Sequence, residues 1–170
     1  SGIDYDRKFI FSEMGYNFEP SEIGAAFGLE QLKKLKKFSK IRNENYFYHY
    51  KFFQSLKNFF DLPVMFDKVF TNFLAYPVII KDNKKINRKK LQIYLEKKSI
   101  QTRPIFTGNS LRHPAFVKLR SSVNKVNNYP NSDFIMKNGL LIGCHQGLST
   151  KEINYIHRVI LNFKKKIFSE

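Results

Sequence analysis

The side chains of this 170-residue sequence that could do chemistry on their own are few and far apart. They are Arg103, His113, Cys144, His145 and the neighbouring pair Tyr16-Asn17. Arg103 interrupts an otherwise apolar segment, and a cation there needs a carboxylate or an anionic ligand as its partner. Cys144 fits a small buried residue better than a nucleophile, and His145 fits a hydrogen-bonded loop histidine better than a base. The residues alone leave the role of Arg103 open.

Motifs that define a reaction by themselves are absent from the sequence. It has no Walker loop, no G-x-G-x-x-G, no H-E-x-x-H and no G-x-S-x-G. The single cysteine excludes an intrachain disulfide and a cysteine-built metal cluster within this segment, and we expect no metal site. His49 and His157 lie in predicted helices, where we expect them to be structural or solvated.

The elements that must position these side chains begin with a long helix. Pro20 suits the first turn of a helix and Ser21 is a good cap. Apolar residues then recur at helical spacing as far as Leu56, which predicts one long helix or two in sequence. We interpret residues 1–56 as a connecting segment and residues 57–170 as a small α/β domain.

Three strands are predicted in the second segment, at residues 73–80, 100–106 and 140–143. Pro77 marks an edge or a bulge in the first of them, because proline cannot donate to a sheet ladder. Residues 118–130 are polar and lack periodicity, which predicts a surface loop.

Helices are predicted between and after these strands. Asn87 is expected to cap a helix to residue 98, and Ser132 a short helix to residue 138. The last helix begins at Ser149, which has capping-box spacing to Glu152. Its buried stripe is expected to consist of Ile153, Ile156, Val159, Ile160 and Phe163. Together these elements predict a small sheet covered by helices.

The composition is strongly basic, with 30 Lys and Arg against 14 Asp and Glu and a net charge of +16. Such a charge fits nucleic acid, an anionic membrane or a phosphorylated ligand. It also fits lysine-rich solvated helix faces, which we favour because only 7 of the 30 are arginine. A nucleic-acid-binding domain is the distant alternative, and it predicts tight and steeply salt-dependent binding.

We expect a cytoplasmic protein that does not enter a membrane. No apolar run is long enough to span a bilayer. The polar residues 1–7, with few apolar residues after them, do not resemble a signal peptide.

Three runs of sequence carry a resemblance to a known family. The run MGYNFEPSEIGAAFGLEQLKKL at residues 14–35 resembles the G-Y-N…E…A-A-x-G-x-x-Q-L signature of the DegT/DnrJ/EryC1/StrS family of sugar aminotransferases and dehydratases. The runs at residues 100–116 and 129–156 resemble the branch of CDP-4-keto-6-deoxyglucose 3-dehydratase-like proteins. The resemblance covers nearly the whole chain in the right order.

The resemblance implies the C-terminal small domain of a fold-type-I enzyme that uses pyridoxal or pyridoxamine 5'-phosphate. The residue that forms the Schiff base, or replaces it, is then expected upstream of Ser1, together with the large cofactor domain. We therefore assign no catalytic residue to this segment, and we expect the segment alone to be inactive and to bind no cofactor.

The resemblance also implies roles for residues that contact the cofactor and the substrate. Asn17 is expected to reach the cofactor phosphate of the neighbouring subunit in a homodimer, with Gly15 and Tyr16 shaping the loop. Many aminotransferases have arginine two residues after this asparagine, whereas this chain has Glu19. The residues expected to bind the sugar nucleotide are Gln101, Arg103, Asn109, His113 and His145.

The implied activity is modification of a nucleotide-activated 4-keto sugar. The first hypothesis is a 4-keto-6-deoxy-sugar 3-dehydratase of lipopolysaccharide O-antigen biosynthesis. The alternative is a nucleotide-sugar aminotransferase of the same family. Some dehydratases of this family also hold an iron–sulfur cluster; the single cysteine of this segment cannot supply its ligands, which leaves open a cluster held by cysteines upstream.

Overall fold

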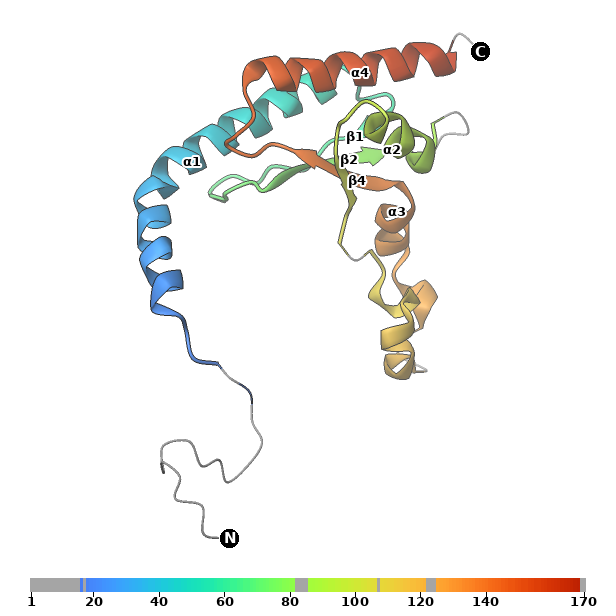
Figure 1. Ribbon diagram of the computed structural model, residues 1–170. Coiled ribbons are helices and arrows are strands. Elements are labelled where there is room, and N and C mark those ends of the chain that lie inside the picture. The colour runs from blue at the N-terminus through green and yellow to red at the C-terminus, as the bar shows by residue number, and fades with distance from the viewer. Residues whose placement is uncertain (1–15, 17, 82–85, 107, 122–124, 169–170) are drawn as a thin grey trace, which may run out of the picture. The chain divides into compact units, whose positions relative to one another are not determined.

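The computed structural model in Figure 1 describes residues 16, 18–81, 86–106, 108–121 and 125–168. The chain divides into two compact units, residues 1–35 and 36–170. Helix α1 (Glu22–Gln54) crosses from one unit into the other. The predicted long helix is therefore a single helix, whereas the predicted division near residue 56 falls just after its end and stays a prediction.

The first unit presents an apolar stripe of α1 to solvent. Ile23, Phe27 and Leu32 recur at helical spacing and are 83%, 66% and 64% exposed. Apolar residues at this spacing are typical of a helix face that packs against another surface.

The second unit is built around a four-stranded antiparallel sheet with the strand order β1-β2-β4-β3. The strands are β1 (Phe60–Asp61), β2 (Ala75–Ile80), β3 (Thr102–Pro104) and β4 (Gly139–Gly143). β1 pairs with Ile79 and Ile80, so among the described residues no strand pairs with β2 on the β1 side at Pro77, in agreement with the expected edge position. Buried and partly buried residues alternate along β2, because one face of the strand packs on the core.

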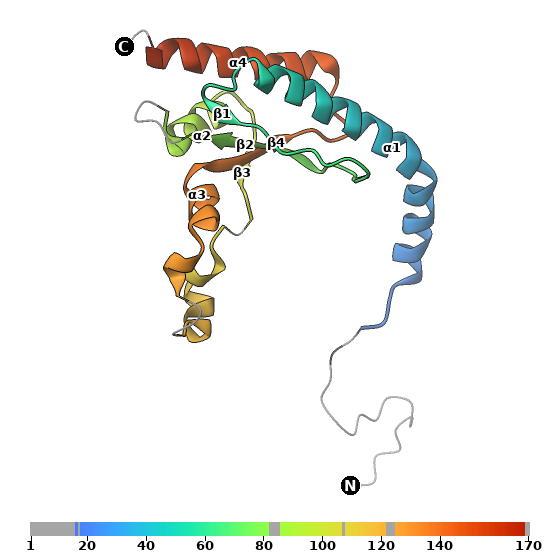
Figure 2. The same ribbon diagram turned by 180° about the vertical axis from the view of Figure 1, so that it is seen from behind.

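Helices α2 (Arg88–Glu96) and α4 (Thr150–Phe168) pack with the second half of α1 around this core. α4 lies beside α1 in both views (Figures 1 and 2). Every residue of the predicted α4 stripe is buried, from Ile153 at 0% to Ile156 at 6% exposed. Asn87 caps α2 by accepting from the amides of Lys89 and Lys90, as predicted.

Helix α3 (Pro130–Asn138) begins earlier than predicted. Pro130 takes the first helical position, where its missing amide proton costs nothing, so Ser132 lies inside the helix rather than at its cap. The expected surface loop at residues 118–130 contains the short 3₁₀ helix Val126–Asn128 and the end of another, Pro114–Leu119. The predicted fold class, a small sheet with covering helices, is confirmed.

Ser99 gives a test of the turn that leads from α2 into β3. Its φ of 58° lies in the left-handed region, which costs an L-residue about 1–2 kcal/mol. Glycine relieves this strain but gains entropy in the unfolded chain. We expect Ser99→Gly to raise the free energy of unfolding by about 1 kcal/mol in urea titrations. The matched variant Lys97→Gly, at a φ of −62°, should lower it; equal changes at both positions would contradict the assignment.

Candidate functional site

A pocket of about 400 Å³ lies in the second unit where the start of β3 meets the end of β4. Its walls come from the residues before and within β3, the turn after β4 and the first turns of α4. Three of the five predicted substrate-binding residues, Gln101, Arg103 and His145, line this one pocket. Glu152 and Tyr155 line it from α4.

The Arg103 guanidinium is the cation of this pocket. Arg103 is exposed, and in the described residues no carboxylate lies within ion-pair distance of it. With the Gln101 amide oxygen turned toward it, Gln101 accepts from Nη1 at 3.3 Å and from Nη2 at 2.9 Å. A planar guanidinium oriented in this way fits an anion with paired oxygens, such as a phosphate or a diphosphate.

The turn after β4 carries His145 and is held by α1. The side-chain amide of Asn45 donates to the carbonyl oxygens of His145 at 3.1 Å and Leu148 at 3.2 Å. Arg42 Nε donates to Gln146 Oε1 at 2.7 Å in the same turn. His145 Nδ1 accepts from the amide of Gly147 at 3.1 Å, so Nε2 is the ring nitrogen left for a ligand.

A pair of buried histidines bonds to the residue at the end of β4, directly before this turn. His49 Nδ1 lies 3.0 Å from His157 Nε2, and His49 Nε2 lies 3.0 Å from the carbonyl oxygen of Gly143. Burial lowers the pKa of His49 to about 4, and burial together with the charge of His49 lowers the pKa of His157 to about 3. Both rings are thus neutral near pH 7, and their expected structural role is confirmed.

Cys144 is fully buried beside the pocket. Its exposed fraction is 0%, its Sγ lies 3.7 Å from the carbonyl oxygen of Phe73, and burial raises the pKa of the thiol to about 11. A thiol in this state is a poor nucleophile near pH 7, because only the thiolate reacts. The interpretation of Cys144 as a small buried residue is confirmed.

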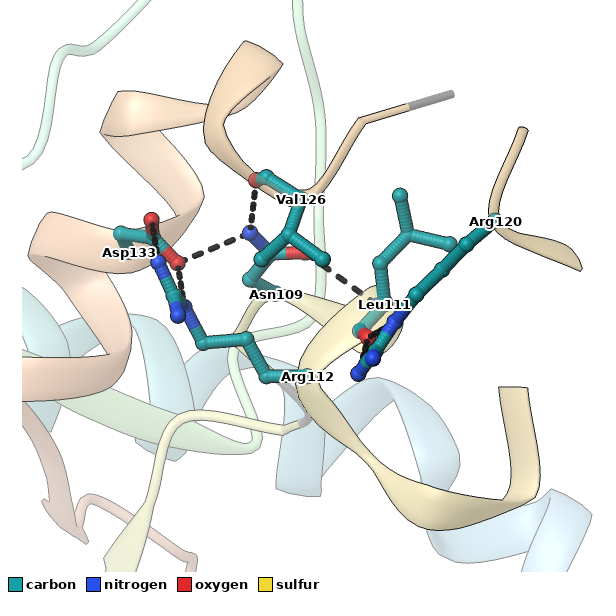
Figure 3. A network of polar contacts seen from close by, with 6 residues as sticks. All are labelled: Asn109, Leu111, Arg112, Arg120, Val126 and Asp133. Atoms are coloured by element: carbon teal, nitrogen blue, oxygen red, sulfur yellow. Dashed lines mark hydrogen bonds and ion pairs between the residues drawn. The ribbon is translucent and has the colours of Figure 1, made fainter. Parts of the chain in front are cut away.

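Asn109 lies away from this pocket, inside the segment that joins β3 to α3 (Figure 3). Its exposed fraction is 3%. The amide nitrogen donates to Val126 O at 2.9 Å and to Asp133 Oδ1 at 2.8 Å, and Oδ1 accepts from the amide of Leu111 at 3.2 Å. Its described polar contacts are therefore internal, and its contact with a substrate stays a prediction.

Two further contacts fix the same segment. Arg112 donates from Nε and Nη2 to the two oxygens of Asp133, both at 2.5 Å, and with the bond from Asn109 this lowers the Asp133 pKa to about 2 (Figure 3). Gly108 has a φ of 68°, and a Cβ there would lie 2.4 Å from Met136 Cβ, so only glycine fits. His113 is half-buried at the end of the 3₁₀ turn Ser110–Arg112, outside the pocket lining described above.

We expect Asn109→Ala to loosen this segment, because it leaves Leu111 N and Val126 O without their described partners. The local cost is about 2 kcal/mol. Hydrogen exchange at the Leu111 amide should then be faster by a factor of about 30. Asn127→Ala, at an exposed asparagine in the same segment, is the control. Unchanged exchange at Leu111 would contradict a bracing role for Asn109.

The residues expected at the cofactor lie in the first unit. Tyr16 is 88% exposed and packs its ring near that of Phe18, with centroids 5.6 Å apart. Gly15 and Asn17 lie outside the described residues. Sequence reasoning also missed Asn45, which carries no motif and holds the turn after β4, and Glu152, which lines the pocket and was expected only as a cap. Glu152 does fill that role, since its Oε2 accepts from Ser149 N at 2.7 Å.

The basic charge is spread over the surface. Exposed lysine pairs occur on α1 and α2, at Lys36-Lys37 and Lys89-Lys90, and Lys165-Lys166 are exposed on α4. This distribution agrees with solvated helix faces. No helix in the described part of the chain is both long and apolar enough to cross a membrane.

Comparisons with known proteins find relatives among nucleotide-sugar-modifying enzymes. The chain is 34% identical over 160 residues to GDP-4-keto-6-deoxy-D-mannose 3-dehydratase of Escherichia coli O55:H7, covering 94% of this chain and 40% of that protein. It is 33% identical over 152 residues to lipopolysaccharide biosynthesis protein RfbH of Salmonella typhimurium, covering 89% and 34%. A structure of the E. coli dehydratase with bound hydrated PLP matches with a TM-score of 0.68 at 33% identity, over 94% of this chain and 40% of that one.

The fold and these matches define a partial domain of the PLP-dependent fold, spanning well under half of the relatives' length and lying in their C-terminal part. A profile of the DegT/DnrJ/EryC1/StrS aminotransferase family matches residues 1–161, and the chain belongs to this family. The predicted family is confirmed. A sugar transaminase also matches, at the lower identity of 27%.

Proposed function

We propose that this chain is the C-terminal part of a nucleotide-sugar 3-dehydratase that works with pyridoxal or pyridoxamine 5'-phosphate in lipopolysaccharide sugar biosynthesis. The observation that carries the proposal is the 34% identity over 94% of the chain to a GDP-4-keto-6-deoxy-D-mannose 3-dehydratase. A relative of similar identity is a lipopolysaccharide biosynthesis protein. The intact enzyme is expected to be a cytoplasmic homodimer.

The pocket supports a role in binding the nucleotide sugar. A diphosphate offers oxygens to both Nη atoms of Arg103, and Gln101 keeps the guanidinium plane in one orientation. Because His145 Nδ1 accepts from Gly147, Nε2 carries a proton and is a second donor on the same wall. The residues in this pocket thus bind and orient the substrate.

The described residues of this pocket fit an anion rather than the whole cofactor. Its described lining has one carboxylate, Glu152, and no lysine, so it has no amine for a Schiff base. When bound, pyridoxamine phosphate supplies an amine and an electron sink for loss of the C3 hydroxyl. The contribution proposed for this chain toward the cofactor is the loop at Gly15, Tyr16 and Asn17, reaching the phosphate of the neighbouring subunit.

The whole protein that contains this chain provides the test. It is incubated with GDP-4-keto-6-deoxymannose, and separately with the CDP-linked 4-keto-6-deoxyglucose, in the presence of cofactor and glutamate. A product that lacks the C3 hydroxyl by mass spectrometry supports the proposal. A product that keeps this hydroxyl and carries an amine at C4 identifies an aminotransferase and contradicts the dehydratase assignment.

The aminotransferase is the second candidate, favoured by the match to a sugar transaminase. Binding to nucleic acid is the distant one, and it rests only on the net charge of +16. A filter-binding titration with DNA or RNA tests the nucleic-acid hypothesis. Weak binding that disappears near physiological salt excludes a specific nucleic-acid function.

A further inference from the structure

Glu96 joins the end of α2 to the start of β3 through two hydrogen bonds, which together are called the lock. It is the last residue of α2, and its Oε1 accepts two hydrogen bonds from Thr102. The main-chain amide of Thr102 donates at 2.7 Å and its Oγ1 donates at 2.8 Å. Thr102 is 3% exposed and directly precedes Arg103, so the lock acts on the residue next to the pocket cation.

Strand β3 is short and lies at one edge of the sheet. It has three residues and pairs with β4. Because Thr102 gives its amide to Glu96, the alternation of an antiparallel ladder leaves Arg103 as the residue whose main chain faces β4. Pro104 has no amide proton to contribute. The two bonds to Glu96 therefore take the place of a neighbouring strand on the free edge of β3.

Two effects of Glu96 on an anion at Arg103 oppose each other. Its two bonds hold the backbone from which Arg103 projects, which favours binding. Its negative charge lies close enough to Arg103 for the two to interact, which disfavours an incoming anion. A variant that keeps the acceptor oxygen but removes the charge separates the two effects.

We propose that Glu96 is a positioning residue that holds the Arg103 guanidinium in the pocket and thereby sets the affinity for the diphosphate of a nucleotide sugar. This inference rests on the proposed function, because it requires Arg103 to bind a diphosphate. Glu96 itself lies outside the pocket lining described above. It acts through Thr102 and the strand.

Inorganic pyrophosphate is the probe. The chain is titrated at pH 7 and constant salt, and the dissociation constant is read from chemical-shift changes of the Arg103 and Leu141 amides, with thermal unfolding measured in parallel. Glu96→Ala should weaken binding about tenfold, because the guanidinium is no longer held in place. Glu96→Gln should bind at least as tightly as the wild type, because the acceptor stays and the charge is removed.

A matched control removes one negative charge, as Glu96→Ala does, but leaves the bonds between Glu96 and Thr102 intact. Glu44→Ala removes an exposed carboxylate of α1 whose described ion pair, with Lys40, is 4.0 Å long, and binding should stay as in the wild type. Thr102→Val keeps the amide bond and loses the hydroxyl bond, and should weaken binding about threefold while leaving the chain folded.

The outcomes distinguish the inference from the proposed function. If Arg103→Met leaves pyrophosphate binding unchanged, the diphosphate role of the pocket fails, and the inference fails with it. If binding depends on Arg103 but Glu96→Ala binds as tightly as Glu96→Gln, the positioning role alone is overturned. Lower thermal stability of Glu96→Ala with an unchanged dissociation constant also overturns the positioning role, because Glu96 then acts on stability only.

Discussion

Lowering the pH from 7 to 4 is expected to destabilise the second unit by about 3 kcal/mol through His49 alone. The pKa of His49 is about 4 in the fold against an ordinary value of 6.5, and that of His157 is about 3. Below pH 6.5 these two histidines bind protons in the unfolded chain but stay unprotonated in the folded chain. Stability is therefore complete above about pH 6.5, falls as the pH drops toward 4, and levels off below the folded pKa values.

The geometry of the pair explains the size of the effect. Neutral rings satisfy one another when His49 Nε2 donates to Gly143 O and His49 Nδ1 accepts from His157 Nε2. Protonation of both rings places two N–H groups face to face inside the core. The neighbouring rings of Phe52 and Tyr76 give no charge to offset it. The loss of about 3 kcal/mol is a large share of the stability of an ordinary domain.

Urea unfolding between pH 4 and 7.5 measures this dependence. His157→Gln should be less stable at pH 7 and should flatten the dependence, because one titrating ring is gone. His113→Gln is the control, since that half-buried histidine lies outside the pair. A wild-type stability that stays constant from pH 6.5 to pH 4 would contradict the neutral-pair assignment.

Replacing Arg103 by methionine is expected to lower kcat/KM of the whole enzyme for its nucleotide sugar about 100-fold. Charge-assisted hydrogen bonds contribute about 1.5–3 kcal/mol each, and the guanidinium can make two in parallel. Arg103→Lys should recover only part of the loss, because an ammonium group lacks the planar fork. Stability should change by less than about 0.5 kcal/mol, because Arg103 is exposed.

Steady-state kinetics on the whole protein check this expectation. Arg88→Met is the matched control, since Arg88 is also an arginine near the surface and its described bond is to Lys137 O. It should leave kcat/KM unchanged. An Arg103→Met enzyme with wild-type kcat/KM would remove the diphosphate role from this pocket.

The sequence by itself determined the elements whose signals are local. The Asn87 cap, the Ser149 and Glu152 pair and the α4 stripe depend on residues three or four positions apart, so a short window contains the whole signal. The family motifs are likewise contiguous runs, and they were enough to place the chain. Strand β1 was not predicted, because its two residues, Phe60 and Asp61, are too few to form a periodic pattern.

Only the tertiary structure decided which side chains meet. Arg103 and His145 come from different strands' ends and reach one pocket because β3 pairs with β4. His49 and His157 are 108 residues apart and bond because α1 and α4 pack side by side. Asn109, for which the sequence suggested no internal partner, donates to Val126 and Asp133. Partners of polar groups are chosen by packing across the chain, and sequence spacing carries no record of that choice.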